Sequence, residues 1–255
     1  MAGVARRSSS GPRAYGRHFL RSRALAAAIV ADARVGAADL VLDLGAGAGA
    51  LTRELARRAR RVWAVELDPA LARELERRFA GTNVRVVHAD ATRLRWPEEP
   101  FKVVANVPFA RTTAILRRLL DDPSVALVAA ELVVQWELAA KRAAVWPSTL
   151  TGVYWGAWYR FALVRRLPPC AFAPEPSVAA GVLRIERRRE PLVAARDRAA
   201  WRAFVKRGFV AGRPEVPPRV FKRLGRNLGF APQARARDLD AAQWAALFRA
   251  VRPGR

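Results

Sequence analysis

The stretch VLDLGAGAGALT, residues 41–52, decides the fold of this chain. Its hydrophobic start predicts a buried strand, and Gly45, Gly47 and Gly49 predict a turn before the helical pattern LTRELARRARR. A second strand, VWAVELD, follows and carries Glu66 near its end. Strand, glycine turn, helix, strand and carboxylate are typical of a nucleoside-binding βαβ unit, in which glycines allow close backbone approach and the carboxylate accepts ribose hydroxyls.

Further strands and helices alternate around this unit. The predicted strands are residues 39–44, 62–66, 83–88, 101–105, 125–135, 153–167 and 177–185, and the predicted helices are residues 23–33, 52–60, 69–79, 112–120 and 137–144. Such alternation predicts an α/β fold with a doubly wound, mostly parallel sheet. We expect one antiparallel pair of strands near the end of the sheet.

Three regions differ in composition. Residues 1–14 are rich in Ser, Gly, Pro and Arg and predict a flexible basic arm, which contacts phosphates or has no role. Residues 15–186 carry the α/β pattern, and residues 187–255 predict a small basic helical domain. Its amphipathic pieces are residues 198–209, 217–228 and 240–251.

The charge of the chain favours a polyanionic partner. Hydrophobic residues make up 52%, which argues against disorder of the whole chain, while the formal net charge is +24. Residues 184–255 alone carry 19 Lys/Arg against 6 Asp/Glu. A field of this sign attracts nucleic acid. The alternative is a merely solvated basic surface, because GC-rich coding inflates arginine everywhere, so the motifs must decide.

Cysteine and histidine are scarce. Cys170 is the single cysteine, so no internal disulfide forms, and with only His18 and His88 no metal site is expected. No apolar run reaches the roughly 18 residues of a membrane span, and the N-terminus lacks a signal-peptide core. We therefore expect a cytoplasmic protein without a membrane partner.

The glycine stretch favours S-adenosylmethionine over NAD. Glycine occurs at every second position, unlike the G-x-G-x-x-G of most dinucleotide folds, and no Gly-Lys-Ser/Thr follows to make a P-loop. Asp43 offers a carboxylate to a cationic amino-acid moiety, Glu66 is the expected ribose ligand, and Asp90 is placed to accept the adenine amino group. Each carboxylate alone also fits a helix cap or a solvated loop, but three in successive units favour a binding site.

The segment Asn106-Val107-Pro108-Phe109 is the sharper signal. Transfer to an exocyclic amine of a base needs acceptors for its N–H groups, and the Asn106 side-chain oxygen and the Val107 carbonyl can supply them. Pro108 keeps the preceding residue out of a helix, and Phe109 can stack on an extruded base. By itself Asn-x-Pro is ordinary turn chemistry. Its position after the fourth strand of a nucleoside-binding unit indicates catalysis.

The sequence allows two roles for each of two aromatic side chains. Phe172, in CAFAPEP, is either the second face of a base sandwich or a core aromatic between prolines. For His18 a packing or backbone-bonding role is preferred over that of a catalytic base, because no partner is recognisable.

The motifs GRHFL, VLDLGAGAGALT, VELD, HADATRL, NVPF and FAPEPSV, in this order, resemble the rRNA adenine N6-methyltransferases. This family comprises the erythromycin-resistance (Erm) enzymes and the KsgA-type small-subunit dimethyltransferases. The resemblance implies a Rossmann-like class I methyltransferase sheet, with S-adenosylmethionine bound by Gly45, Gly47, Glu66 and Asp90. It also implies a target adenine held by Asn106 and Phe109, and a helical C-terminal domain that helps to bind RNA.

Residues and resemblance together give the expected site. The cofactor residues are His18, Leu20, Asp43, Gly45, Ala46, Gly47, Glu66, Leu67, Asp90, Ala91 and Asn106, and the catalytic residues are Asn106, Val107, Pro108, Phe109 and Phe172. Arg17 stands where the family usually has Gln, so no cofactor contact is assigned to it. Val107 and Phe109 look closer to the Erm branch than to the NLPY of KsgA types.

The expected activity is methylation of N6 of one adenine in the peptidyl-transferase loop of 23S rRNA, which confers macrolide, lincosamide and streptogramin B resistance. The enzyme is expected to act as a monomer on naked or partly assembled rRNA. Alternatives are small-subunit rRNA dimethylation, a noncatalytic RNA-binding protein on the same fold, and DNA adenine methylation.

Overall fold

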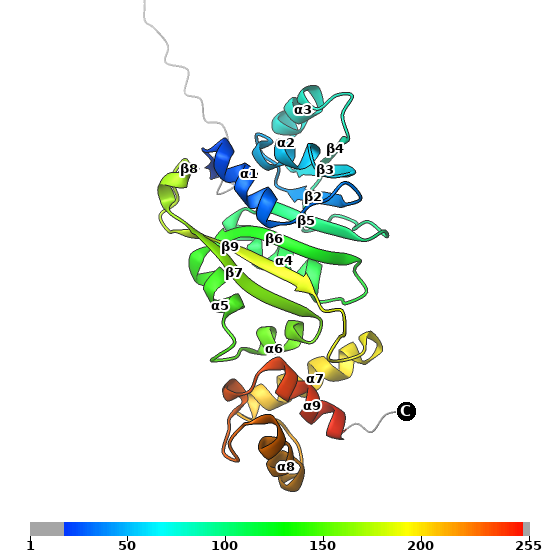
Figure 1. Cartoon of the computed structure of the whole chain (residues 1–255), viewed down its shortest axis with the longest axis vertical. Coiled ribbons are helices and arrows are strands. Elements are labelled where there is room, and N and C mark those ends of the chain that lie inside the picture. The colour runs from blue at the N-terminus through cyan, green and yellow to red at the C-terminus, as the bar shows by residue number, and fades with distance from the viewer. Residues whose placement is uncertain (1–17, 252–255) are drawn as a thin grey trace, which may run out of the picture.

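A central sheet flanked by helices, with a helical unit at one end, makes up the computed structural model, which describes residues 18–251 (Figure 1). The expected arm at residues 1–14 and Arg17 lie outside the described residues. Within residues 18–251, no helix combines the length and apolar character needed to cross a membrane.

The central sheet has seven strands in the order β4-β3-β2-β5-β6-β9-β7. Their bounds are β2 (Leu40–Leu44), β3 (Arg61–Glu66), β4 (Val84–His88), β5 (Phe101–Asn106), β6 (Leu127–Gln135), β7 (Tyr159–Leu167) and β9 (Ala180–Arg187). The strands from β4 to β6 are parallel, whereas β9 is antiparallel to both β6 and β7. The doubly wound sheet is confirmed, but two antiparallel pairs replace the single pair expected.

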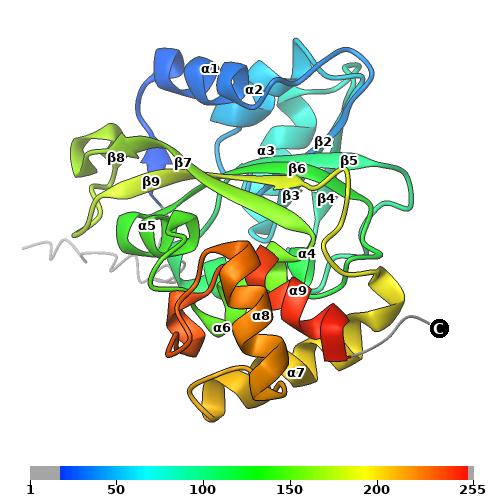
Figure 2. The same cartoon turned by 60° about the horizontal axis from the view of Figure 1, so that its bottom comes forward.

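Helices cover both faces of the sheet (Figure 2). On one face lie α1 (Arg23–Asp32), α2 (Ala50–Ala56) and α3 (Pro69–Arg78), and on the other α4 (Thr112–Leu120) and α5 (Trp136–Ala143). Alternate strand residues divide between the two layers, because successive side chains of a strand point to opposite faces. Val41 packs with α1 and α2, while Leu40, Leu42 and Leu44 join the core under α4.

One predicted strand is partly wrong. Residues 153–167 were expected to be extended, but the structure has α6 (Leu150–Gly156) before β7. The Thr149 hydroxyl caps this helix by accepting from the Gly152 N–H at 3.0 Å, and Tyr154 and Trp155 are buried in the core. β-branched and aromatic residues favour strands only weakly when a cap and tertiary packing favour a helix. The helix that follows the glycines also ends earlier than predicted: the prediction was residues 52–60, and α2 ends at Ala56.

Two very short strands pair distant parts of the chain. β1 (Phe19–Leu20) and β8 (Phe172–Ala173) form a separate antiparallel ribbon. The Arg21 N–H extends it by donating to the Ala171 carbonyl at 2.9 Å. The ribbon brings Phe19 and Leu20 to the proline-rich segment, a contact that no local pattern predicted.

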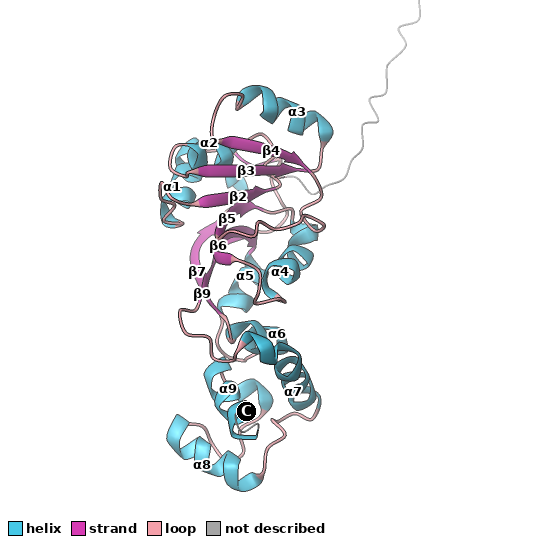
Figure 3. Cartoon of the chain, turned by 90° about the vertical axis from the view of Figure 1, so that its right-hand side faces the viewer, coloured by secondary structure: helices cyan, strands magenta, loops and turns pink. Residues whose placement is uncertain are grey.

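The C-terminal helices α7 (Arg198–Val210), α8 (Pro218–Leu228) and α9 (Ala241–Val251) lie at the opposite end of the molecule from β4 (Figure 3). Trp201, Phe204, Trp244 and Phe248 pack ring against ring at their centre, with centroids 5.4–6.4 Å apart. Because α6 packs on α7 and α9, the core continues from the sheet into this unit. The boundary between the α/β domain and the helical domain, between residues 186 and 187, stays our proposal.

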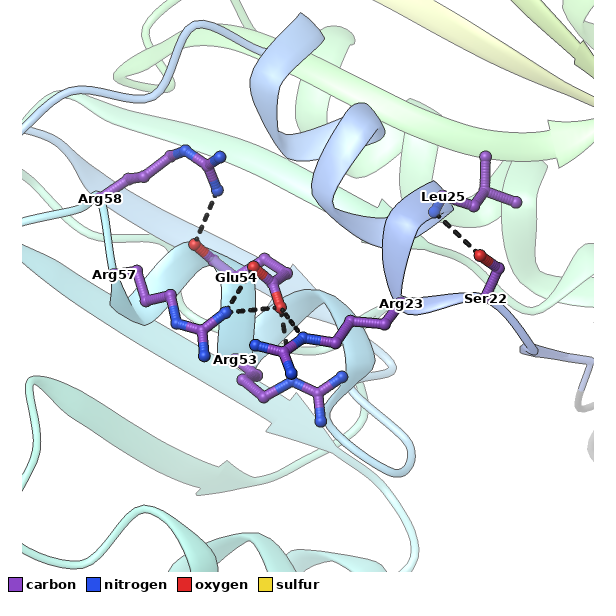
Figure 4. A network of polar contacts seen from close by, with 7 residues as sticks. All are labelled: Ser22, Arg23, Leu25, Arg53, Glu54, Arg57 and Arg58. Atoms are coloured by element: carbon purple, nitrogen blue, oxygen red, sulfur yellow. Dashed lines mark hydrogen bonds and ion pairs between the residues drawn. The ribbon is translucent and has the colours of Figure 1, made fainter.

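A buried carboxylate joins α1 to α2 (Figure 4). Glu54 on α2 is 4% exposed and pairs with Arg57 at 2.8 Å, Arg23 at 3.3 Å and Arg53 at 3.4 Å. Burial alone raises the pKa of such a carboxyl, but hydrogen bonds and charges from Arg57 and Arg23 outweigh it, so the pKa of Glu54 is lowered. Arg23 begins α1, so Glu54 also fixes the helix that follows β1.

A substitution at Gly208 tests the packing of α7 on α9. A Cβ there would lie 2.5 Å from Trp244 Cη2 and 3.1 Å from the Arg213 carbonyl. Gly208→Ala gains about 1 kcal/mol of helix propensity, but overpacking costs ~1–3 kcal/mol and the rigid ring places this site at the upper end. We expect a net loss of about 2 kcal/mol in the free energy of unfolding by denaturant titration.

Gly36→Ala is the matched control, because the nearest atom to its added Cβ is 3.8 Å away. That variant should stay within about 0.5 kcal/mol of the parent. Equal stability of the two variants would contradict the packing described for α7 and α9.

Candidate functional site

A cavity of ≈ 410 Å³ opens at the carboxyl ends of β2, β3, β4 and β5. This is the edge at which open α/β sheets bind ligands, and its size suits a small molecule. Among the residues assigned from the sequence, those that line it are His18, Gly45, Gly47, Glu66, Leu67, Asp90, Ala91, Asn106, Val107, Pro108 and Phe109. The structure therefore brings most of the expected cofactor residues and the NVPF segment to one cavity.

The glycine turn has no room for side chains. Gly45 and Gly47 have φ of +78° and +56°, a region that favours glycine. A Cβ on Gly47 would lie 2.6 Å from the Phe19 ring, and one on Gly45 would lie 3.2 Å from Pro108 Cδ. The turn thus packs directly against the β1 segment and the NVPF segment. Side-chain-free backbone faces the cavity between them.

Glu66 fixes this turn from the end of β3. Its Oε2 accepts from the Gly47 N–H at 2.8 Å, and its Oε1 accepts from the Asp68 N–H at 2.9 Å. The residue is only 6% exposed and lines the cavity. Each carboxylate oxygen has two acceptor sites, so Glu66 can still accept from two ribose hydroxyls.

Asp90 presents a carboxylate on the next strand end. Its Oδ1 accepts from the Thr92 N–H at 2.8 Å and from the Thr92 hydroxyl at 2.7 Å. These hydrogen bonds, helped by the charge of Arg111, lower the pKa of Asp90. The group is therefore ionised near neutral pH, with Oδ2 left to accept from an exocyclic amine of a purine.

The Asn106 side chain is oriented by the N-terminal segment. Its Nδ2 donates to the His18 carbonyl at 2.7 Å, which leaves Oδ1 as the free end of the amide. His18 is held in turn, because its Nδ1 donates to the Pro174 carbonyl at 2.8 Å. Backbone bonding was the role preferred for His18. The contact also reveals a link from the FAPEP segment to Asn106.

The aromatic ring beside Phe109 is that of His18. The two ring centroids are 5.5 Å apart with a tilt of 37°, and both residues line the cavity. Phe172 instead is 0% exposed and packs in the core under α1. This placement fits the alternative of a core aromatic, and the role of Phe172 as the second face of a base sandwich stays a prediction. The ring is buried because β8 pairs with β1 and turns it inward.

Three other assigned residues lie outside the cavity lining. Leu20 packs against the core under α1, and Ala46 is 8% exposed and packs with α3. Asp43 is 1% exposed, and its Oδ2 accepts from the Thr52 hydroxyl at 2.7 Å. Burial is the main cause that raises the pKa of Asp43 to about 7. The structure places Asp43 inside the β2–α2 junction, and its contact with a cationic moiety stays a prediction.

The cavity also contains residues that the sequence did not single out. They are Phe19, Val65, Ala89, Thr92, Ala110, Arg111 and Ile115. Phe19 and Thr92 stand within the GRHFL and HADATRL motifs, so their place in those motifs was a usable signal. Arg111 lies just past NVPF, where only the short helix of residues 109–111 turns it toward Asp90.

Comparison with known proteins decides the family. The family described as "Ribosomal RNA adenine dimethylase" matches residues 9–238. The chain belongs to this family. Ribosomal RNA adenine dimethylases transfer methyl groups from S-adenosylmethionine, so the chain is an S-adenosylmethionine-dependent rRNA adenine methyltransferase. The cavity fits that cofactor, since it combines Cβ-free backbone at Gly45 and Gly47 with acceptors on Glu66 and Asp90.

Individual relatives come from both branches of the family. "Mycinamicin-resistance protein MyrB" of Micromonospora griseorubida is 41% identical over 246 residues, covering 93% of this chain and 78% of MyrB. "Ribosomal RNA small subunit methyltransferase A" of Synechococcus sp. (strain JA-3-3Ab) is 34% identical, covering 91% of this chain and 90% of the relative. The crystal structure of 23S rRNA methyltransferase ErmE is similar, with a TM-score of 0.81 and 30% identity, covering 91% of this chain and 98% of ErmE.

The raised pKa of Asp43 predicts a specific pH dependence. The unfolded carboxyl titrates near ~3.9, whereas the folded group titrates at about 7. The amount by which protonated Asp43 raises the free energy of unfolding is therefore fully present below about pH 4 and is lost as pH rises to ~7. The loss amounts to as much as ~4 kcal/mol. Asp43→Asn keeps an acceptor for Thr52 and does not titrate.

Denaturant titrations of both proteins at pH 4.5 and pH 8 measure this effect. We expect the stability of the parent relative to Asp43→Asn to fall between the two pH values, with Glu76→Gln on the exposed face of α3 as a control that shows no such change. A parent–variant difference that is the same at both pH values would refute the raised pKa.

Proposed function

We propose that this enzyme methylates N6 of one adenosine in the peptidyl-transferase loop of 23S rRNA and thereby confers resistance to macrolide, lincosamide and streptogramin B antibiotics. The observation that carries the proposal is the orientation of Asn106, whose Nδ2 is bound to the His18 carbonyl at 2.7 Å beside a cavity lined by Glu66 and Asp90. The similarity to ErmE and to the mycinamicin-resistance protein supports 23S rRNA as the substrate.

Different residues of the site contact the methyl donor and the methyl acceptor. Glu66 and Asp90 accept from the ribose hydroxyls and the adenine amino group of the cofactor, which supplies a methyl group on a positively charged sulfonium. Asn106 Oδ1 and the Val107 carbonyl accept from the N–H groups of the target amine. This contact favours the tetrahedral geometry in which the nitrogen lone pair is available. Alignment of reacting groups in this way supplies a large part of a catalytic effect.

Phe109 and Pro108 shape the place for the target base. Pro108 has φ −55° and ψ 124°, so the chain leaves β5 in an extended form before the short helix at residues 109–111. Phe109 then lies at the cavity, partly exposed, where an extruded adenine can stack on it. Such an enzyme reaches its base in unassembled or partly assembled rRNA, in the cytoplasm and as a monomer.

The helical unit supplies charge for the RNA backbone. Arg219, Lys222, Arg223 and Arg226 are exposed along α8. In the described part of the chain, no carboxylate pairs with any of them. Cations without internal partners are available to replace counterions on phosphates, which makes RNA affinity depend on salt. We assign residues 187–255 to RNA binding on this ground.

Small-subunit rRNA dimethylation is the second candidate. It is favoured by the Synechococcus relative, whose name refers to the small subunit and which matches 91% of this chain. The site chemistry is the same for both candidates, since both transfer a methyl group to N6 of adenine. The RNA substrate therefore separates them.

Methyl transfer to purified rRNA tests the proposal directly. With labelled S-adenosylmethionine, we expect label at one adenosine of protein-free 23S rRNA and none in small-subunit particles. Label in 16S rRNA alone would replace the first candidate by the second. Expression of the chain in a susceptible bacterium should raise the inhibitory concentration of a macrolide but not that of an antibiotic with another target.

Asn106→Ala tests the role of the amide. Loss of one positioned polar group costs about 10²–10³-fold in rate in comparable sites, so we expect kcat to fall by that factor. Cofactor affinity should change little, because Glu66 and Asp90 remain. Glu76→Gln should leave both quantities unchanged. Full activity of Asn106→Ala would remove the basis of the proposed mechanism.

A further inference from the structure

A second hollow, of ≈ 530 Å³, lies on the sheet away from the cofactor cavity. It is formed by β3, β4 and the segment that joins β4 to β5, and its walls include Trp63, Arg85, Val87, Leu94 and Trp96. Residues 89–100 contain turns and no helix, so no helix of the joining segment covers this side of β3 and β4. We name these five residues the tryptophan groove.

The tryptophan groove presents rings with guanidinium groups against them. The Arg85 Cζ lies 5.1 Å from the centroid of the Trp63 ring, and the Arg118 Cζ lies 5.8 Å from that of Trp96. Trp96 is fixed in place, because it stacks on the buried Phe101 at 5.9 Å and its Nε1 donates to the Arg118 carbonyl at 3.1 Å. Planar groups held in fixed positions lose little entropy when a further flat group stacks on them.

The charge around the groove is positive. Its two carboxylates are already paired, Glu98 with Arg95 at 2.9 Å and Glu99 with Arg61 at 3.2 Å as well as with Arg60. Arg85 is exposed, and within residues 18–251 no carboxylate pairs with it. An anionic group is therefore attracted to the rim, and a second copy of a chain with net charge +24 is repelled.

The groove opens on the same face of the sheet as the cofactor cavity. Val65 on β3 and Ala89, just past the end of β4, line the cavity, and Trp63 and Val87 precede them by two residues. Residues two apart on a strand share a face and lie about 7 Å apart. The strands β3 and β4, which carry Trp63, Arg85 and Val87, lie at the end of the molecule opposite α8 (Figures 1 and 3). A long RNA in contact with both regions would pass the cavity between them.

We propose that the tryptophan groove binds an unpaired nucleotide of the rRNA substrate, outside the target adenosine, by stacking its base on the Trp–Arg pairs and its phosphate near Arg85. Aromatic and arginine planes in a basic groove are how proteins hold single-stranded RNA. The inference rests on the proposed function for the identity of the RNA. It gives the enzyme a second contact that helps to position a folded substrate.

Charge reversal of Arg85 tests the groove. We expect Arg85→Glu to raise the KM for a long rRNA transcript about 10-fold, with kcat and cofactor affinity unchanged, and to lower the salt slope of RNA binding by about one. Arg73→Glu is the matched control, because Arg73 is an exposed residue of α3 with the same charge change on the other face of the sheet. Equal effects of the two variants would overturn the proposal.

Crosslinking supplies a test that does not depend on a variant. Irradiation of the unmodified enzyme with transcripts carrying 4-thiouridine should give crosslinked peptides that contain Trp63 or Trp96. Crosslinks confined to the helical unit and the cofactor cavity would refute the groove. If methyl transfer occurs on 16S rRNA instead, the proposed function fails, and the same comparisons with 16S transcripts still decide whether the groove binds RNA.

Discussion

The hydrogen bond from the Asn106 amide to the His18 carbonyl is the contact on which the reactive edge of the cavity depends. It leaves only the amide oxygen free, which is the end that the proposed mechanism places against the target amine. The bond exists because β1 pairs with β8 and because His18 is anchored on the Pro174 carbonyl. These two hydrogen bonds join residues that are 88 and 156 positions apart in the sequence, and they meet at the end of β5. Phe172 anchors the ribbon in the core.

The three carboxylates at the ends of β2, β3 and β4 show how environment assigns a role. Glu66 keeps backbone N–H partners and spare lone pairs at the cavity. Hydrogen bonds from Thr92 lower the pKa of Asp90, and this carboxylate lines the cavity. Asp43 is buried, and this burial is the main cause that raises its pKa to about 7, which suits a group inside the fold. Similar residue types at successive strand ends therefore lie in different settings, two at the cavity and one inside the fold.

Local patterns predicted most of the sheet and the parts of the site that follow strands. The glycine turn, Glu66, Asp90 and the NVPF segment were predictable because parallel strands bring their carboxyl ends to one edge. The places of Asp43 and Phe172 were not, since they depend on side-chain burial and on a ribbon between distant segments. The helix α6 was not predicted, because its aromatic residues are typical of β-strands. The tryptophan groove likewise follows from the absence of a helix over β3 and β4 in residues 89–100.

The central claim is that one cavity positions the methyl donor against Asn106. A crystal structure of the enzyme with bound S-adenosylhomocysteine tests this most directly. The account predicts ribose hydroxyls within hydrogen-bond distance of Glu66, the adenine amino group on the Asp90 Oδ2, and the sulfur facing the Asn106 Oδ1. A ligand bound with its sulfur away from Asn106, or with Glu66 and Asp90 uninvolved, would contradict it.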